Sequence, residues 1–335
     1  MNNATTPPTA TARRRLVLQS AAALAASAAL PFARAQSGYP NRPIRILCPF
    51  PPAGSTEIVA RALADKFQSV LGQPAIVENK PGGNTSIGAQ MVATAPPDGY
   101  TLLFTAEATH LIHTMQAKLP YDSLKDFAPV AAVSRANWVM VVNPSVPVKT
   151  LPELIAYAKA NPGKLNYASA GIGNANHLGL ELFNLRAGTK IVHVPYKGMN
   201  PGMQDLLAGR VDLMMSTVSF LQPQVDAGAL RALAYTSVPP GSTFPTFAQY
   251  GFEELNSMES LNVLLAPAAT PAPIIAQLSA AVQKVLAMPE VIEYFEKQLL
   301  LAPSYMNAQD LGQRMRADRT RFSEIIEKAH INLTS

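Results

Sequence analysis

Short apolar runs rich in β-branched residues alternate with stretches of helical periodicity along most of the chain. Residues 44–48 predict a strand, because they are apolar apart from Arg45, and a proline-rich turn ends it. A helical pattern follows from Ser55 or Thr56 to Gly72. The next expected elements are strand 75–77, helix 87–95 and strand 100–105. This βαβαβ order predicts a parallel sheet covered by helices.

The middle and the end of the chain continue this alternation. Further strands are expected at 130–133, 138–143, 165–169, 192–194, 211–215, 230–235 and 262–266. Helix N-terminal signals stand at Thr150, Asn200-Pro201, Thr270-Pro271, Pro289 and Asn307, and helical patterns also cover 178–185 and 218–227. At roughly 300 residues without its leader, the chain favours two lobes over one.

Two of the expected strand-to-helix loops have the same chemistry. Backbone N–H groups at a helix start lack helical partners and lie at the positive end of the helix dipole, so they can hold a carboxylate without Lys or Arg. Taken alone, each loop is explained by helix capping, but the recurrence favours anion binding. The first loop supplies Phe50, Ala53, Gly54, Ser55 and Thr56, and the second supplies Ser169, Ala170, Gly171, Asn174 and His177.

Other chemistry-bearing residues admit simpler explanations. Gly171 and Gly173 form part of a dinucleotide motif, but its third glycine is missing, which argues against a nucleotide. His110 and His113 are three residues apart without a Cys or a clear acidic partner, so surface or hydrogen-bonded histidines are favoured over a metal site. Glu107 follows a strand at the expected ligand edge, where it is either a solvated acid or a partner for a ligand ammonium or hydroxyl group.

The first 35 residues have the pattern of an export signal. Arg13-Arg14-Arg15 precedes an Ala/Leu-rich run over 21–30, and Ala33-Arg34-Ala35 offers a cleavage site before Gln36. The paired arginines fit twin-arginine export, although an ordinary secretory signal has similar features. We therefore expect a soluble periplasmic product.

The positive charge of the chain belongs mostly to this signal. The sequence has 27 Lys and Arg residues against 22 Asp and Glu residues. Residues 1–35 contain four arginines and no acid, which leaves 23 basic residues against 22 acidic ones. This near balance of charge gives no indication of nucleic-acid binding. The only cysteine, Cys48, lies in an apolar strand and is interpreted as a buried hydrophobe.

Several motifs, in order along nearly the whole mature chain, carry a resemblance to a known family. They are Cys48-Pro49-Phe50, Gly54–Arg61, Val77–Gly83, Pro97–Leu103, Leu119–Asp122, Asp126–Val130, Val194–Gly198, Gly209–Asp212 and Leu265–Pro267. In these motifs the chain resembles the Bug-type receptors, which are the extracytoplasmic substrate-binding proteins of tripartite tricarboxylate transporters. The resemblance identifies the family and leaves the ligand open.

The resemblance implies a two-lobed α/β periplasmic binding protein, with a mostly parallel sheet flanked by helices in each lobe and the ligand cleft between them. One lobe would comprise residues 38–138 plus 263–335, and the other residues 139–262. The two loops described above look like the family's carboxylate-binding loops, one from each lobe, and Tyr196 of the Val194–Gly198 motif joins them as a candidate ligand-binding residue. Such receptors hold the acid mainly through backbone N–H groups and water.

The chain departs from the family pattern at several positions. Ala53 and Glu57 stand where Gly and Asp are usual, Glu107 stands where a neutral residue is more frequent, Ser216 replaces a common Asp, and a usual tryptophan is absent around Leu261. These differences leave open di- and tricarboxylates, aromatic acids and amino acids as ligands. Glu107 raises the hypothesis of an amine-bearing acid.

Two classes of function follow from the sequence. The preferred one is a monomeric, non-enzymatic receptor that delivers an organic acid to membrane permease subunits, or senses it as an orphan. The alternative is a small α/β hydrolase or transferase acting on a carboxylic acid. The sequence has no nucleophile elbow, zinc-ligand spacing or complete phosphate loop, so we expect neither a cofactor nor a metal.

Overall fold

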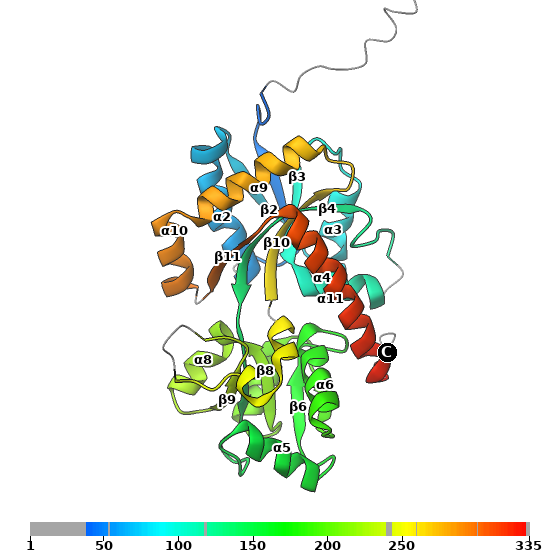
Figure 1. Ribbon diagram of the computed structural model, residues 1–335, viewed down its shortest axis with the longest axis vertical. Helices are drawn as coiled ribbons and strands as arrows, with labels where there is room; N and C mark the ends of the chain where they lie inside the picture. Colours follow the sequence, from blue (N-terminus) through cyan, green and yellow to red (C-terminus); the bar gives the residue numbers. More distant parts are fainter. Residues whose placement is uncertain are drawn as a thin grey trace, which may run out of the picture. The chain divides into compact units, whose positions relative to one another are not determined.

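The computed structural model describes residues 38–52, 54–116, 119–238, 243–258, 260–299 and 301–332. The chain divides into two units, residues 1–41 and 42–335. Of the first, only 38–41 are described, and they form turns. The expected export signal lies outside the described residues. All the elements below belong to the second unit, which Figure 1 shows coloured along the sequence.

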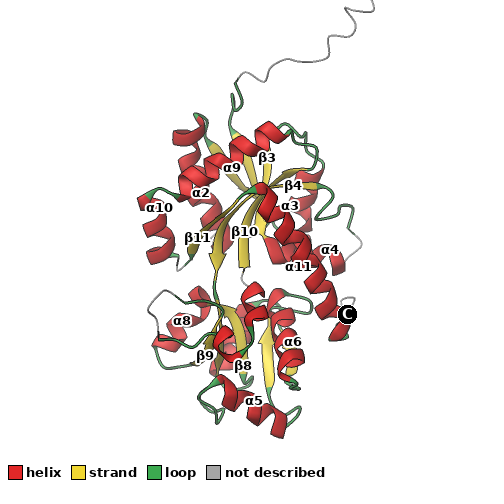
Figure 2. Cartoon of the chain, in the orientation of Figure 1, coloured by secondary structure: helices red, strands yellow, loops and turns green. Residues whose placement is uncertain are grey.

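The first sheet has six strands in the order β11-β4-β10-β3-β1-β2 (Figure 2). The parallel strands are β1 (Ile44–Cys48), β2 (Ala75–Asn79) and β3 (Thr101–Ala106), as the βαβαβ pattern predicts. The antiparallel ones are β4 (Phe127–Ala136), β10 (Ser260–Pro267) and β11 (Ala302–Met306). The C-terminal third of the chain therefore completes a sheet that the N-terminal third begins.

The second sheet has five strands in the order β7-β6-β8-β5-β9. They are β5 (Trp138–Val142), β6 (Asn166–Ser169), β7 (Val192–Pro195), β8 (Leu213–Thr217) and β9 (Arg231–Tyr235). Strand β6 is parallel to β7 and β8, whereas β5 is antiparallel to β8 and β9.

Both sheets are therefore mixed, and the expectation of mostly parallel sheets is corrected. Helical crossovers force parallel pairing only between the strands that they join. Strands β4, β5 and β10 are not joined to their sheet neighbours in this way, because the chain passes from one sheet to the other next to them. The residue patterns of these strands reveal burial but not direction.

The helices cover the sheets and, apart from α4, for which no helix was predicted, lie close to their expected positions. They are α2 (Ser55–Leu71), α3 (Ser86–Ala93), α4 (Glu107–Gln116), α5 (Leu151–Ala160), α6 (Ala175–Ala187), α7 (Met199–Leu207), α8 (Val218–Asp226), α9 (Ala272–Leu286), α10 (Pro289–Glu293) and α11 (Ala308–Lys328). Helix α2 ends at Gly72 in the left-handed conformation, and Thr150 and Asn307 cap α5 and α11 as expected. Helix α7 begins at Met199 after Gly198, slightly before the predicted Asn200-Pro201 start.

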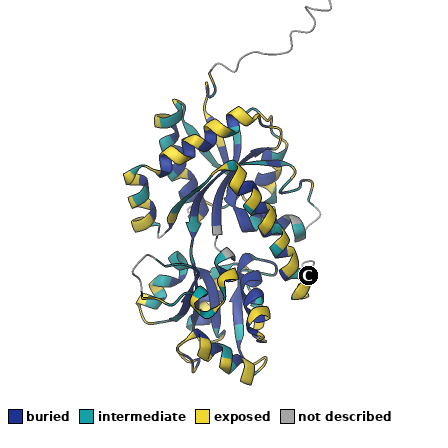
Figure 3. Cartoon of the chain, in the orientation of Figure 1, coloured by how far each residue is buried: buried dark blue, intermediate teal, exposed yellow. Residues whose placement is uncertain are grey.

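Two links of very different length join the sheets. Only Asn137 separates β4 from β5, so the chain passes from the first sheet to the second within one residue. Residues between β9 and β10 make the return. Next to the first link, the backbone N–H of Trp138 donates to Thr236 Oγ1 at 2.8 Å. Figure 3 shows the strands as the buried layer and the outer faces of the helices as the exposed one.

Candidate functional site

The loop between β6 and α6 spans residues 170–174, and two glycines shape it. Gly171 has a φ of +135° and Gly173 a φ of +69°, both in the region that favours glycine. The side chain of Asn174 caps α6 by accepting a hydrogen bond from the Asn176 N–H at 3.2 Å. The expected capping role of Asn174 is therefore confirmed, and the loop leads directly into a helix N-terminus.

This loop forms one wall of a small cavity of about 230 Å³. The opposite wall belongs to α4, so the two walls come from elements that flank different sheets. The lining residues are Thr109, Ile112 and His113 of α4 together with Ala170, Gly171, Ile172, Gly173, Asn174 and Ala175. None of them carries a carboxylate, a guanidinium or an ammonium group. Polar contacts in the cavity are consequently left to backbone groups, Thr109, His113 and Asn174.

Three N–H groups of the loop have partners within the chain. The Gly171 N–H donates to Ser169 Oγ at 3.1 Å, the Gly173 N–H donates to His177 Nδ1 at 2.9 Å, and the Asn174 N–H donates to the Gly171 carbonyl at 3.2 Å. In the part of the chain that the structure describes, no group accepts from the N–H of Ala170, Ile172 or Ala175. These amides are the donors that remain for a bound anion.

Behind the loop lies a cluster of polar and aromatic side chains. Ser169 is fully buried, and its Oγ lies 2.6 Å from His193 Nε2 on β7. The His193 ring stacks on the His177 ring with 3.8 Å between centroids. Burial lowers the pKa of His177 to about 3 and that of His193 to about 4, so both rings are neutral at pH 7.

Tyr167 on β6 and Glu181 on α6 extend this cluster. The Tyr167 ring stacks on His193 at 4.9 Å, and its hydroxyl donates to Glu181 Oε1 at 2.5 Å. Burial, followed by the nearby Glu181 charge, raises the pKa of Tyr167, which stays protonated. Burial also raises the pKa of Glu181.

Tyr196 lies beside the loop but its phenol has a partner of its own. Its backbone N–H donates to the Ser169 carbonyl at 3.1 Å, which joins the end of β7 to the end of β6. Its hydroxyl donates to Asp205 Oδ2 at 2.6 Å, and Arg210 pairs with the same carboxylate. Tyr196 does not line the cavity, so its proposed contact with ligand stays a prediction.

The loop between β1 and α2 lies at the other expected helix entrance. Ala53 is outside the described residues. Gly54 precedes α2 with extended geometry, and among the described side chains none caps this helix. Ser55 is exposed and Thr56 is buried. The Phe50 carbonyl accepts from Asn79 Nδ2 at 3.0 Å, which holds the loop against β2.

Glu57, which stands where Asp is usual in the family, pairs with a residue of its own helix, so the structure does not favour a contact between its carboxylate and a ligand. Its side chain is 4% exposed and forms an ion pair with Arg61 one turn later. The residues of this first loop are not among those that line the cavity described above. Its part in ligand binding therefore stays a prediction.

Glu107 is directed into the protein rather than toward the cavity. It is 1% exposed, and its carboxyl group hydrogen-bonds Asp318 of α11, which is fully buried. Asp318 also pairs with Arg314 and Arg321. Burial, and then the Asp318 charge, raises the pKa of Glu107 to about 8, so Glu107 is protonated at pH 7 and donates to Asp318. Glu107, which the sequence placed at the ligand-binding edge of the sheet, instead joins α4 to α11 through its hydrogen bond with Asp318.

The two histidines of α4 have different surroundings. His110 is buried between Tyr121 and Phe127, and burial lowers its pKa to about 4. His113 lies one turn further and lines the cavity. In the described parts of the chain, no three His, Cys, Asp or Glu residues are grouped as metal ligands.

The α4 wall is the part of the site that sequence reasoning missed. Thr109, Ile112 and His113 are spaced i, i+3, i+4 directly after β3, so one helical face contains all three. That spacing, at the end of β3 where a ligand was expected, could have predicted that this helical face lines the site. The direction of that face depends on α11, which is far away in sequence.

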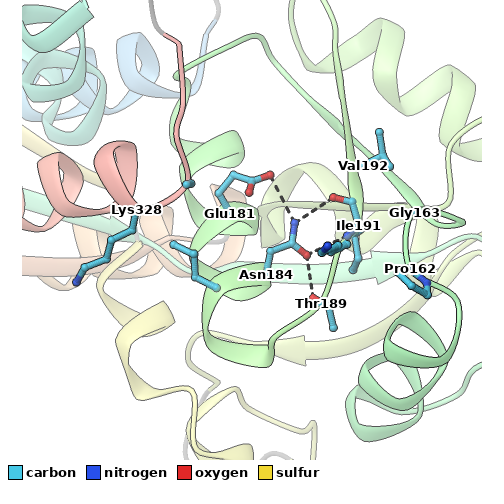
Figure 4. A pocket seen from close by; sticks show the side chains of 11 residues that line it. Pro162, Gly163, Glu181, Asn184, Thr189, Ile191, Val192 and Lys328 are labelled. Carbon is cyan, nitrogen blue, oxygen red and sulfur yellow. Dashed lines mark hydrogen bonds between the residues drawn. The ribbon is translucent and has the colours of Figure 1, made fainter.

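A second hollow, of about 650 Å³, opens at the far end of α6 (Figure 4). Its centre is Asn184, whose Nδ2 donates to the Ile191 carbonyl at 3.0 Å and whose Oδ1 accepts from the Ile191 N–H at 3.2 Å. Thr189 Oγ1 donates to the same Oδ1 at 2.8 Å. Asn184 thereby fixes the connection from α6 to β7, two residues before His193.

Residues 59–331 match the family described as "Tripartite tricarboxylate transporter family receptor". The chain belongs to this family. BugT of Bordetella pertussis is 37% identical over 265 residues, covering 78% of this chain and 81% of BugT. The family assignment agrees with the resemblance found in the sequence.

Solved receptor structures have the same two-lobed α/β fold. R. palustris Rpa4515 with adipate is 30% identical, with a TM-score of 0.73, over 88% of this chain and 99% of that one. MatC from Rhodopseudomonas palustris with bound malate is 28% identical, with a TM-score of 0.68, over 86% of this chain and 100% of that one. Among the described residues of the present chain, no helix combines the length and apolar character needed to cross a bilayer.

Proposed function

We propose that this receptor binds a small dicarboxylate in the cavity between α4 and the β6–α6 loop and delivers it to a tripartite tricarboxylate-type permease. The observation that carries the proposal is the composition of the cavity, which is lined by loop backbone and a helix N-terminus and by no charged acid or base. An acid bound there meets no carboxylate that would repel it.

Two backbone donors supply the anion contacts. The N–H groups of Ile172 and Ala175 have no acceptor among the described residues, and Ala175 is the first residue of the 13-residue helix α6. Its N-terminus adds partial positive charge at the cavity. We infer that one ligand carboxylate accepts hydrogen bonds from these two amides.

A second carboxylate contact is proposed at the uncapped N-terminus of α2. Gly54, Ser55 and Thr56 lead into this helix without a described side-chain cap. The relatives with adipate and malate hold acids with two carboxylates, which supports a ligand that needs two anion contacts. The proposed lobes are residues 38–138 plus 263–335 and residues 139–262, with the acid between them.

The cavity favours acids without an amine. Its described lining offers no carboxylate for an ammonium group, and the Glu107 carboxyl group is buried against Asp318. We therefore propose dicarboxylates rather than amino acids as ligands. The hypothesis that Glu107 selects an amine-bearing acid is not favoured.

A thermal-shift screen followed by calorimetry tests the ligand class. The panel contains adipate, malate and other mono-, di- and tricarboxylates, together with aromatic acids and amino acids. We expect dicarboxylates to raise the melting temperature, because a ligand at 100 times its Kd stabilises the folded state by about 2.7 kcal/mol. Amino acids should leave it unchanged. The proposal fails if no carboxylate produces a shift.

The enzyme alternative has one supporting contact, the Ser169–His193 pair at 2.6 Å. A serine nucleophile needs access to substrate, and Ser169 is fully buried. We propose that the chain has no catalytic activity. Chromatography of each bound acid after prolonged incubation should recover it unchanged, and any product would favour the alternative.

Periplasmic export is proposed from the first 35 residues and from membership of a receptor family. The mature protein is expected to be monomeric and to begin at Gln36. Mass spectrometry of the protein from the periplasmic fraction measures its N-terminus, and light scattering measures its oligomeric state. A protein retained in the cytoplasm with residues 1–35 intact would contradict export.

A further inference from the structure

We propose that His193 and His177 are positioning residues for the β6–α6 loop, and that His193 acts through Ser169. Each histidine fixes one of the two glycine amides of the loop, so that the neighbouring Ile172 and Ala175 amides stay directed at the cavity. The inference rests on the proposed role of this loop in binding the acid. It adds residues that are outside the lining of the cavity described above and that the sequence did not single out together.

The first connection runs from His193 to Gly171. Ser169 Oγ lies 2.6 Å from His193 Nε2 and 3.1 Å from both the N and the O of Gly171. With a proton on His193 Nε2, the serine oxygen accepts from the imidazole and from the Gly171 N–H and donates to the Gly171 carbonyl. The fully buried Ser169 hydroxyl then uses its one donor and both acceptor positions, as its burial requires.

The second connection runs from His177 to Gly173. The Gly173 N–H donates to His177 Nδ1 at 2.9 Å, so that nitrogen must be without a proton and His177 must be neutral. The titratable groups that face the pair are Tyr167 and Glu181, and the two rings face each other at 3.8 Å. Burial disfavours a charge on either ring, and stacking at this distance disfavours charging both at once.

The loop needs such connections because of its glycines. Gly171 and Gly173 both have positive φ, and glycine has more accessible backbone conformations than any other residue. Ile172 lies between them, and Ala175 follows the cap residue Asn174. Two side-chain hydrogen bonds, one at each glycine, restrict the backbone to the conformation that presents these amides to a ligand.

The histidine on β7 is itself held from two sides. Tyr167 stacks on His193 and is anchored by Glu181, while Asn184 fixes the start of β7 through Thr189 and Ile191 (Figure 4). Because none of these residues lines the cavity, they orient His193 without touching a ligand. This arrangement fits a positioning role rather than direct recognition.

Paired substitutions distinguish the effect of the histidine hydrogen bonds from the effect of ring stacking. His193→Phe and His177→Phe keep a stacked ring and remove the hydrogen bonds. His193→Gln keeps a donor near the position of Nε2, and His177→Asn keeps an acceptor near the position of Nδ1. His330→Asn, at an exposed position just after the end of α11, is the matched histidine control.

Two measurements on the purified protein decide the inference. Calorimetry with adipate and malate should show about a tenfold loss of affinity in each Phe variant, the equivalent of one hydrogen bond, with recovery to within about threefold in the Gln and Asn variants. Amide hydrogen exchange without ligand should be faster over residues 169–175 in the Phe variants alone. Unchanged exchange and unchanged affinity in the Phe variants would overturn the inference.

The two proposals can fail separately. If neither acid binds the wild-type protein, the proposed function fails, while faster exchange of the loop in the Phe variants still supports the positioning role. If a Phe variant does not fold, Ser169→Ala removes the connection to Gly171, and unchanged loop exchange in that variant overturns the inference.

Discussion

At the scale of single residues, Glu107 and Asp318 form a buried acid pair that joins α4 to α11. With the proton on Glu107, the negative charge lies on Asp318, which forms ion pairs with both Arg314 and Arg321. Glu107 Oε1 has no hydrogen-bond partner among the described residues. The hydrogen bond that joins α4 to α11 therefore exists only while Glu107 is protonated.

Replacing Glu107 with Gln should remove this dependence. The folded-state pKa of about 8 lies above the unfolded value of about 4.5, so the wild-type protein loses stability as the pH rises from 4.5 to 8. An uncharged amide can donate to Asp318 at any pH. We expect the melting temperature of the variant to fall less than that of the wild type between pH 5 and pH 8.

The same variant tests the ligand hypothesis that the sequence raised. Its affinity for adipate relative to amino acids should equal that of the wild type, because the Glu107 side chain does not reach the cavity. A variant that specifically loses binding of amine-bearing acids would show that this carboxyl group contacts ligand.

At the scale of elements, the N-terminus of α6 offers a substitution that removes one N–H group. Ala175 is the first residue of the helix, a position that tolerates proline, and Asn174 has the extended geometry (φ −71°, ψ 157°) that precedes proline well. Ala175→Pro should therefore fold. It should bind adipate and malate at least about tenfold more weakly, since one charge-assisted donor is lost.

Ala175→Ser is the matched control, because it keeps the N–H and adds one oxygen atom. Calorimetry at one pH should give near wild-type affinity for this variant. Equal binding by the Pro and Ser variants would mean that the helix N-terminus does not contact the acid.

The limits of prediction from sequence also lie at this scale. Local signals were sufficient for Gly72, Thr150, Asn174 and Asn307, because a helix end is decided by the few residues around it. They were insufficient for the antiparallel strands β4 and β10, since strand direction depends on where the chain returns from. Helix α7 begins at Met199 because Gly198, with a φ of 108°, supplies the turn before the Asn200-Pro201 signal.

In the candidate site, too, local sequence predicted some parts and not others. The β6–α6 loop was predicted from its small residues, whereas the α4 wall and His193 were not. Both are brought to the loop by tertiary packing, α4 by its contacts with α11 and His193 by pairing of β7 with β6. Glu107 shows the converse, because a residue at the expected edge of the sheet turned inward to a partner 211 positions away.

At the scale of the whole molecule, three histidines with lowered pKa values determine how stability responds to acid. Burial lowers the pKa of His110, His177 and His193 to about 4, 3 and 4. Between pH 6.5 and pH 4 the unfolded chain binds protons at these positions and the folded chain does not, so stability falls as the pH falls. Glu107 has the opposite effect above pH 4.5.

We therefore expect the melting temperature to be highest near pH 6.5 and to fall more steeply on the acid side than up to pH 8. Calorimetric unfolding from pH 4 to pH 9 measures this profile. His193→Gln should reduce the slope of the acid limb. A melting temperature that stays constant between pH 6.5 and pH 4.5 would contradict the neutral state of these rings.

The one-residue passage at Asn137 has a practical consequence. Trp138, which follows it, is the only tryptophan in the chain, is 3% exposed, and has an indole N–H without an acceptor among the described residues. We expect a rotation of one sheet against the other at this link to change the surroundings of the indole. The protein thus contains its own optical reporter, and a shift in its emission on adding adipate would follow domain motion in real time without a label.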